Sequence, residues 1–168
     1  SRTILLSINQ HTGTIAYFRI WDGIALSPDK VRNLYITRHV KKNYDLSNMV
    51  KMQYDSLWDS AGTDIVRPSY AWDFRDSTGS DTVYDSISGL AARPVNAETS
   101  SSKATSTNEG MVLNGNYLNL DDFEFGPTIT VELYANVSNK TSWERLMDIG
   151  HDANSHSFSI YRENDYHF

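Results

Sequence analysis

Short runs in which apolar and polar residues alternate make up most of this chain. The clearest run extends from residue 13 to residue 21, where every second side chain would fall on the same face of an extended strand. One face would carry Ala16, Phe18 and Ile20, and the other Ile15, Tyr17, Arg19 and Trp21. This alternation predicts a half-buried β-strand.

Similar runs recur along the chain. Residues 128–137 place apolar side chains on one face and polar ones on the other, which is typical of a strand in an antiparallel sheet. We expect strands at residues 3–8, 14–21, 71–74, 110–113, 117–120, 128–137, 145–149 and 157–161. Residues 3–8 should pair with residues 14–21. Clusters of Gly, Asn, Asp and Ser supply the turns between strands, so a sandwich or barrel is predicted.

One helix is expected, and it follows the strand at residues 14–21. Ser27 can cap free amides, Pro28 fits the first turn, and Asp29 favours the positive end of the helix. Its apolar positions share one face and are Val31, Leu34 and Tyr35.

Two stretches interrupt the strand pattern. Residues 38–69 are too apolar for a solvated tether, so we expect a partly helical linker that packs on a neighbouring surface. Residues 98–108 are rich in Ser and Thr and have no large apolar side chain, which predicts a surface loop.

Composition excludes several classes of protein. With 168 residues and 39% hydrophobic content the chain can bury a substantial core. It has no cysteine, so disulfides and thiolate metal sites are excluded. The net charge of −6, without a basic stripe, argues against nucleic-acid binding. No apolar run is long enough to insert into a membrane, and the first residues lack the layout of a signal peptide.

Four segments resemble laminin-G-like domains, which have a concanavalin A-like jelly-roll fold. The segment Ile-Ala-Tyr-Phe-Arg-Ile-Trp-Asp-Gly, followed by Ala-Leu-Ser-Pro-Asp, is similar to the closing strand and helix of that family. Three further stretches are similar to the opening segment of that family: Trp-Asp-Phe, Val-Tyr-Asp-Ser-Ile-Ser-Gly-Leu and Glu-Gly-Met-Val-Leu-Asn-Gly. The resemblance implies an all-β, antiparallel jelly-roll β-sandwich with one short helix after the closing strand.

The similar segments stand in reverse order, which suggests a piece of a tandem-repeat protein. Residues 1–37 would be the closing strands and helix of one unit, residues 38–69 a linker, and residues 70–168 the first half of a second unit. Such a half lacks strands, and an unpaired edge attracts another strand. Residues 1–37 of the same chain or of a neighbour can complete it. Alternatively, the chain is simply part of a longer protein.

The sequence carries little sign of catalysis. Glucanases of the jelly-roll fold use a Glu-x-Asp-x-x-Glu pattern on one strand, because two carboxyl groups must flank one glycosidic bond. That pattern is absent, and Glu144 and Asp148 on one strand would stand about 13 Å apart. We therefore expect that the protein is not an enzyme. The alternative is a glycoside hydrolase-related domain of the concanavalin A-like fold.

Exposed aromatic rings are the expected means of binding a glycan, because a pyranose presents an apolar C–H face. Trp143 follows a polar run between two strands and is the first candidate, followed by Tyr161 and Tyr166. Trp21 and Trp72 match core aromatics of the family and are expected to be structural.

A calcium site and two modification sites are the remaining candidates. Calcium at the rim of the sandwich is implied by the resemblance, with Asp121, Asp122 and Asp152 as contributors. Asn136 and Asn139 each begin a glycosylation sequon in an expected surface turn.

These observations favour a non-catalytic module for adhesion or assembly on the cell surface, a virion surface or elsewhere outside the cell. We expect it to be lectin-like and carbohydrate-binding within a repetitive structural protein such as a filament. Its expected partners are a glycan or copies of itself in a head-to-tail assembly, without nucleic acid and without membrane insertion.

Overall fold

The computed structural model describes residues 2–7, 12–37, 67–75, 82–95, 103–137, 144–150 and 158–162. In these residues there are eleven strands and one helix. In chain order they are β1 (Arg2–Ser7), β2 (Thr12–Asp22), α1 (Pro28–Thr37), β3 (Tyr70–Asp73), β4 (Val83–Tyr84), β5 (Ala91–Val95), β6 (Thr105–Thr107), β7 (Gly110–Asn114), β8 (Tyr117–Phe123), β9 (Ile129–Val137), β10 (Glu144–Gly150) and β11 (Phe158–Arg162).

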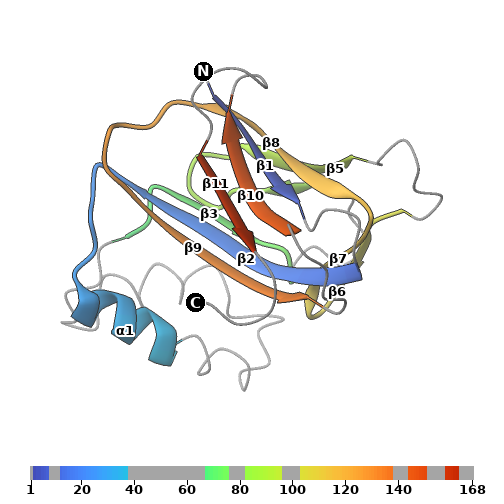
Figure 1. Cartoon of the computed structure of the whole chain (residues 1–168), viewed down its shortest axis with the longest axis horizontal. Helices are drawn as coiled ribbons and strands as arrows, with labels where there is room; N and C mark the ends of the chain where they lie inside the picture. Colours follow the sequence, from blue (N-terminus) through green and yellow to red (C-terminus); the bar gives the residue numbers. More distant parts are fainter. Residues whose placement is uncertain are drawn as a thin grey trace.

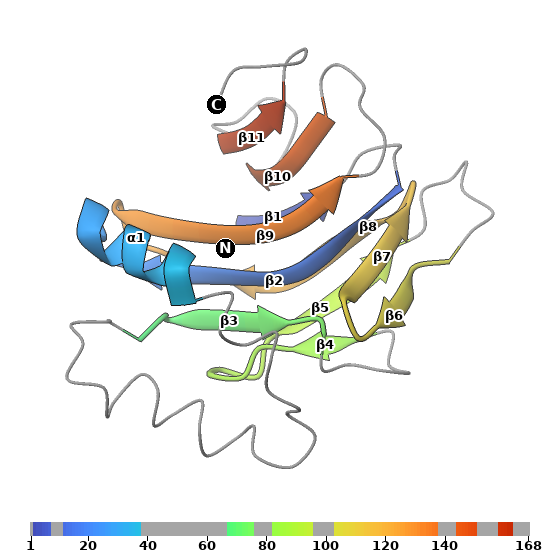
Figure 2. The ribbon, with the colours of Figure 1, turned by 90° about the horizontal axis from the view of Figure 1, so that it is seen from below.

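The strands form two antiparallel sheets (Figure 1). The six-stranded sheet has the order β11-β10-β1-β8-β5-β4. In the five-stranded sheet β2 is central, with β9 along one side and β3 and β7 along the other, and β6 beyond β7 (Figure 2). The prediction of a predominantly β, antiparallel architecture is confirmed.

The chain passes from one sheet to the other at most of its connections. Strands β1, β8 and β10 belong to the six-stranded sheet, whereas β2, β7 and β9 belong to the five-stranded sheet. The predicted pairing of residues 3–8 with residues 14–21 is therefore wrong, because β1 lies between β10 and β8. β1 and β2 are neighbours in the sequence, yet they lie in different sheets.

Both strands of the first 37 residues pair with strands that come much later in the chain. Strand β1 pairs with β8 and β10, and β2 pairs with β3, β7 and β9. The amino-terminal segment thus contributes one interior strand to each sheet within the same chain. Residues 38–66 of the expected linker lie outside the described residues.

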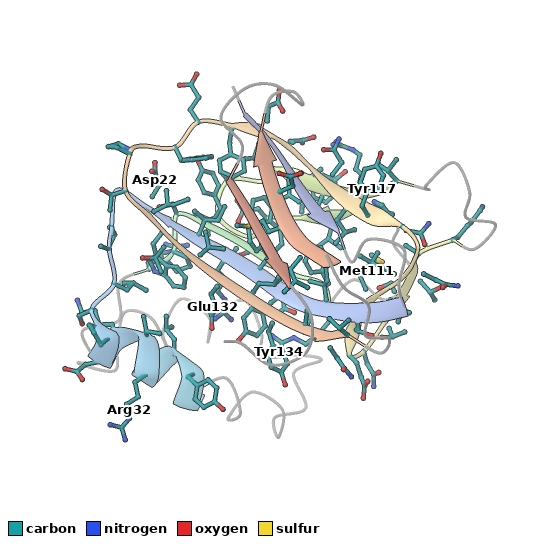
Figure 3. The ribbon with its side chains drawn as sticks, viewed as in Figure 1. Asp22, Arg32, Met111, Tyr117, Glu132 and Tyr134 are labelled. Carbon is teal, nitrogen blue, oxygen red and sulfur yellow. The ribbon has the colours of Figure 1, made fainter. Side chains whose placement is uncertain are left out.

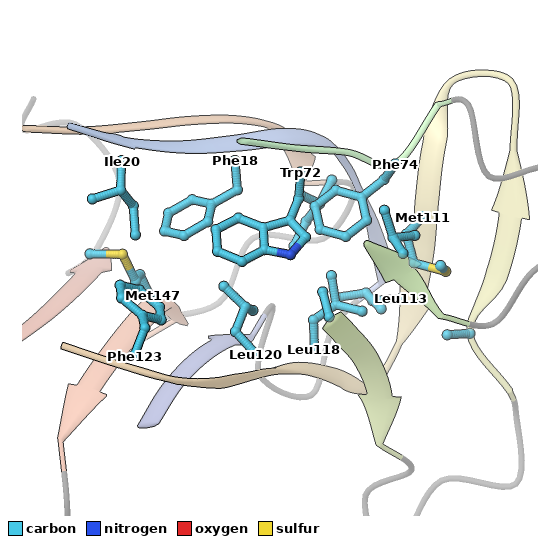
Figure 4. Packing of buried hydrophobic residues seen from close by; sticks show 14 residues of the cluster. Phe18, Ile20, Trp72, Phe74, Met111, Leu113, Leu118, Leu120, Phe123 and Met147 are labelled. Carbon is cyan, nitrogen blue, oxygen red and sulfur yellow. The ribbon is translucent and has the colours of Figure 1, made fainter. Parts of the chain in front are cut away.

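One apolar core fills the space between the sheets. Figure 4 shows Phe18, Ile20, Trp72 and Phe74 on one side and Leu120 among the side chains opposite. The indole nitrogen of Trp72 donates to the carbonyl of Leu90 at 2.9 Å, so this ring is fixed by a hydrogen bond as well as by packing. Trp21 and Trp72 have exposed fractions of 0% and 1%, which confirms that both are structural.

A β-bulge changes the faces of β2 from those predicted. The register with β9 shifts between Ile15 and Tyr17, where β2 carries one extra residue. Ile15 therefore joins Phe18 and Ile20 in the core, although simple alternation put Ile15 with Tyr17 and Arg19 on the opposite face. Period-2 counting fails at a bulge because the extra residue reverses the alternation.

Helix α1 begins as its sequence predicts. The amide of Lys30 donates to Ser27 Oγ at 3.4 Å, and the amide of Val31 donates to the Ser27 carbonyl at 3.0 Å. Leu34 is buried, but Val31 and Tyr35 have exposed fractions of 48% and 57%. Of the three apolar positions expected to share one face of the helix, only Leu34 is therefore packed away from solvent.

The connection between β2 and α1 is fastened to the start of β9. The Thr130 hydroxyl accepts from the amide of Leu26 at 3.0 Å and donates to the carbonyl of Ile24 at 2.9 Å. The carboxylate of Asp22 accepts from the amide of Gly126 at 2.7 Å. These contacts hold the segment before α1 at this end of the five-stranded sheet.

Asp85 ties the turn after β4 to β3. Its buried carboxylate accepts from the amides of Ala71, Ile87 and Ser88, at 2.5, 3.1 and 2.6 Å, and from the Ser88 hydroxyl. A buried carboxylate is stable when several donors replace its lost hydration. Asp85 therefore joins the two sheets at this end of the molecule.

The expected loop at residues 98–108 is partly wrong. Residues 105–107 form β6, which pairs with β7, and Ala104 is buried with an exposed fraction of 8%. Ser and Thr tolerate an edge strand, so composition alone did not distinguish such a strand from a loop.

Two glycines with positive φ provide a test of this packing. A Cβ placed on Gly110 (φ 136°) would lie 2.2 Å from the backbone oxygen of Ile15, whereas one on Gly89 (φ 78°) meets nothing within 4 Å. We expect Gly89→Ala to cost about 1–2 kcal/mol of unfolding free energy from backbone strain alone. Gly110→Ala must also displace the buried strand β2, so its urea unfolding midpoint should fall much further. Equal midpoints would contradict this packing.

Candidate functional site

The outer face of the six-stranded sheet carries a group of accessible polar and aromatic side chains. Val83 and Ala92 point into the core, so the alternation of β4 and β5 places Tyr84 and Arg93 on the outer face. On β8, Asn119 lies opposite Arg93 in the register, and Asp121 is on the same face. We call Tyr84, Arg93, Asn119 and Asp121 the Tyr84 face.

An ion pair organises the Tyr84 face. The Arg93 guanidinium donates to Asp121 Oδ1, and the backbone amide of Ala91 donates to Asp121 Oδ2 at 3.0 Å. The hydrogen bond from Arg93 is the main cause that lowers the pKa of Asp121, followed by the Ala91 amide. That same bond raises the pKa of Arg93. Asp121 is therefore a carboxylate throughout the neutral range.

Three members of this face are open to solvent, whereas the side-chain oxygen of Asn119 is buried and has no hydrogen-bond partner among the described residues. Tyr84 has an exposed fraction of 63%, and the side chains of Arg93 and Asp121 have 51% and 37%. An exposed ring offers an apolar surface, while the guanidinium donates and the carboxylate accepts hydrogen bonds. A ligand with both hydroxyl groups and an apolar C–H face suits this combination.

The outer face of the five-stranded sheet carries a second cluster, the Tyr17 network, of Tyr17, Arg19, Glu132 and Tyr134. Glu132 accepts from the Tyr17 hydroxyl at 3.1 Å and from Arg19 at 2.9 Å. The rings of Tyr17 and Tyr134 stack with centroids 5.5 Å apart, and the Arg19 guanidinium lies 4.2 Å from the Tyr17 centroid. Figure 3 shows Glu132 and Tyr134 on the opposite side of the molecule from Tyr117.

Burial separates the Tyr17 network from the Tyr84 face. Tyr17 and Arg19 have exposed fractions of 3% and 5%, so a ligand cannot reach either group without rearrangement. Burial is the main cause that raises the pKa of Tyr17, and the charge of Glu132 raises it further. Beside the network, Arg75 forms a bidentate pair with Asp73, and its guanidinium lies 5.3 Å from the Tyr17 centroid. The network acts as internal structure.

Most glycan-binding candidates from the sequence fall outside the described residues. This holds for Trp143 and Tyr166, while Tyr161 has its backbone in β11 without a described side chain. For glycosylation, Asn139 is likewise outside, and Asn136 is exposed on β9. The Asn136 sequon therefore begins in a strand, not in the expected surface turn.

Among the described residues, the calcium candidates from the sequence do not come together in one site. No group of three or more metal-ligating side chains occurs there, and Asp152 lies outside it. Asp121 is bound by the positively charged Arg93, which opposes a cation at the same oxygen. Asp122 is the exposed neighbour of Asp121 on β8. The described geometry thus gives Asp121 a cationic side chain as its partner.

The structure does not bring together Glu132 and Asp148, two carboxylates whose substitution would test for hydrolysis. Glu132 lies on the outer face of the five-stranded sheet, where Arg19 binds it. Asp148 lies in β10, opposite Leu5 in the register, and so belongs to the six-stranded sheet. The side chain of Glu144 is outside the described set. Glu132 and Asp148 therefore cannot flank a single glycosidic bond.

Sequence reasoning missed Tyr84 and Arg93. Both lie in short strands that were not predicted, β4 with two residues and β5, which contains Pro94. The available signal was the alternation of Val83 with Tyr84 and of Ala92 with Arg93, because it puts the two apolar residues on one face and the two long side chains on the other.

In comparisons with known proteins, no family model, no curated protein and no solved structure matches the chain. The resemblance to laminin-G-like domains stays a prediction. Within the described residues, no helix has the length and hydropathy required to cross a membrane.

Two ion pairs offer a matched test of burial. Arg19→Met leaves Glu132, whose side chain is only 18% exposed, without its cation, and should cost about 3 kcal/mol of unfolding free energy. Arg93→Met breaks an exposed pair and should leave the urea midpoint close to that of the wild type. Urea unfolding followed by tryptophan fluorescence measures both. A larger loss for Arg93→Met would contradict the assignment of buried and exposed pairs.

The raised pKa of Tyr17 predicts a loss of stability at alkaline pH. Above the ordinary value of 10.0 the unfolded chain loses the Tyr17 proton while the folded chain keeps it, so stability falls as pH rises. We expect the unfolding free energy of the wild type to fall more steeply above pH 10 than that of Tyr17→Phe, by up to about 1.4 kcal/mol per pH unit. Identical slopes would mean that Tyr17 titrates normally.

Proposed function

We propose that this chain is a non-catalytic, carbohydrate-binding module with a role in adhesion and assembly. The glycan is held on the Tyr84 face of the six-stranded sheet. The observation that carries this proposal is the exposed Tyr84 ring beside the exposed Arg93–Asp121 pair on adjacent strands.

The finer fold assignment belongs to the same proposal. We assign a jelly-roll sandwich of the concanavalin A-like kind, with a short helix after β2. Support comes from the repeated crossing of the chain between two antiparallel sheets and from the single core that both sheets share. The laminin-G-like segments of the sequence agree with this arrangement.

The chemistry of sugars favours the Tyr84 face over the Tyr17 network. A pyranose stacks its C–H face on an aromatic ring and exchanges hydrogen bonds through its hydroxyl groups. Tyr84 supplies an accessible ring, Asp121 accepts and Arg93 donates. In the Tyr17 network, Tyr17 and Arg19 are buried and bonded to Glu132, and the exposed ring of Tyr134 is stacked on Tyr17.

A rigid position also supports binding. Asp121 is fixed from two directions, by Arg93 and by the Ala91 amide, and Arg93 and Asp121 lie on the paired strands β5 and β8. Little side-chain freedom is then lost when a ligand binds, which reduces the entropic cost. Asp121 remains charged well below neutral pH, so binding should persist into the mildly acidic range.

A glycan array with the full chain tests this function. We expect binding to at least one glycan class, and Tyr84→Ala should weaken it about tenfold or more, because the stacking ring is removed. Arg93→Met should weaken it as well. Tyr35→Ala is the matched control, since Tyr35 has an exposed fraction of 57% but lies on α1, at the five-stranded sheet (Figure 1).

Two outcomes would contradict the proposal. One is the absence of binding to any glycan by a folded wild-type chain. The other is equal loss with Tyr84→Ala and Tyr35→Ala, which would place the ligand elsewhere or indicate unspecific binding. Hydrolysis of a bound polysaccharide would replace the non-catalytic assignment with the glycoside hydrolase alternative.

A further inference from the structure

Strand β9 forms one side of the five-stranded sheet. Among the described residues it pairs only with β2, along the side of β2 that faces away from β3 (Figure 2). In an antiparallel strand, alternate residues direct their backbone N–H and C=O groups to opposite sides. Half of the backbone groups of β9 therefore point away from β2, as they do in an edge strand that can accept a further strand.

The apolar face of β9 is less well covered than that of β2. Its inward side chains pack against the core but remain only partly buried, and they are Ile129, Val131, Leu133, Ala135 and Val137. On β2, by contrast, Ile15, Phe18 and Ile20 have exposed fractions of 0%, 0% and 1%. The core thus thins toward this edge, where an additional strand would cover more apolar surface.

The sequence of β9 also lacks the usual protection of an edge. Its nine residues include no Lys, Arg, Pro or Gly, which commonly prevent edge-to-edge pairing. The one charged residue is Glu132, and its carboxylate is bound on the outer face by Arg19 and Tyr17. The bulge in this ladder lies on β2, so β9 itself is continuous.

We propose that β9 is a self-association edge, on which the β9 strand of a second copy of this chain pairs in the antiparallel direction. Two copies then share one continuous sheet related by a twofold axis, which is an isologous interface. The pairing names a partner for the assembly role proposed above. It rests on that role alone and not on glycan binding at the Tyr84 face.

The sequence of β9 fits its own antiparallel copy in one register. With the twofold axis at Leu133, all nine residues of β9 are paired. The residue numbers of each pair add up to 266. The inward pairs are then all apolar: Ile129 with Val137, Val131 with Ala135, and Leu133 with itself. The outward pairs are Thr130 with Asn136 and Glu132 with Tyr134. No like charges meet, whereas an axis at Glu132 would place two carboxylates together.

Cysteine cross-linking tests this register without interference, because the chain has no native cysteine. In the proposed dimer, Leu133→Cys meets its own copy across the axis and should form an intermolecular disulfide under mild oxidation. Ala135→Cys is the matched control on the same face. It stands four residues from its own copy, about 13 Å along the strand, which exceeds the reach of a disulfide.

We expect Leu133→Cys to give a covalent dimer on non-reducing gels and Ala135→Cys to remain a monomer. The double variant Val131→Cys with Ala135→Cys should cross-link again, because those two positions face each other. Sedimentation velocity of the wild type provides a measurement that needs no substitution, and it should show twice the monomer mass at high protein concentration. Circular dichroism checks that each variant is folded.

A wild-type chain that stays monomeric at every concentration would overturn the proposal. So would equal cross-linking of the two single variants, because it would indicate random collision. Failure here leaves the glycan array unaffected, and a chain that binds no glycan can still form the dimer. The two proposals therefore fail separately.

Discussion

The structure depends on the pairing of β2 with three strands that follow it in the chain. β2 pairs with β9 along one side and with β3 and β7 along the other. Its inward residues Phe18 and Ile20 are in the core, and its outward residues Tyr17 and Arg19 bind Glu132 on β9. One strand therefore joins the apolar core to the buried ionic network and contributes residues to both.

This arrangement gives the two outer faces different chemistry. On the five-stranded sheet, charge and hydrogen-bonding capacity are satisfied internally, as in the pair of Arg19 and Glu132. On the six-stranded sheet, Arg93 and Asp121 are paired but remain exposed beside Tyr84. Removing one partner of a buried pair leaves an uncompensated charge and is destabilising, whereas an exposed and preorganised pair can exchange its hydrogen bonds with a ligand. That difference is the physical basis for assigning the binding role to the six-stranded sheet.

The alternating pattern predicted most strands, and Ser27, Pro28 and Asp29 predicted the start of α1, because both features depend on local sequence. It did not predict which strands pair, since β1 and β2 lie in different sheets although they are neighbours in the chain. It also misplaced Ile15, because a bulge is a property of two paired strands. Among the site residues, Tyr84 and Arg93 were missed because their strands are short and acquire a face only through pairing, of β4 with β5 and of β5 with β8. Trp21 and Trp72 were expected to be structural from the resemblance to the core aromatics of laminin-G-like domains, and both are buried.

Hydrogen exchange of the full chain tests the central position of β2 most directly. If β2 joins all three neighbouring strands, its amides at residues 17–20 should exchange only through global unfolding, at the same slow rate as those of β7 and β8. Fast exchange in β2 while β7 and β8 stay protected would contradict the account, because the amino-terminal strand would then be an attachment to a sheet that is stable without it.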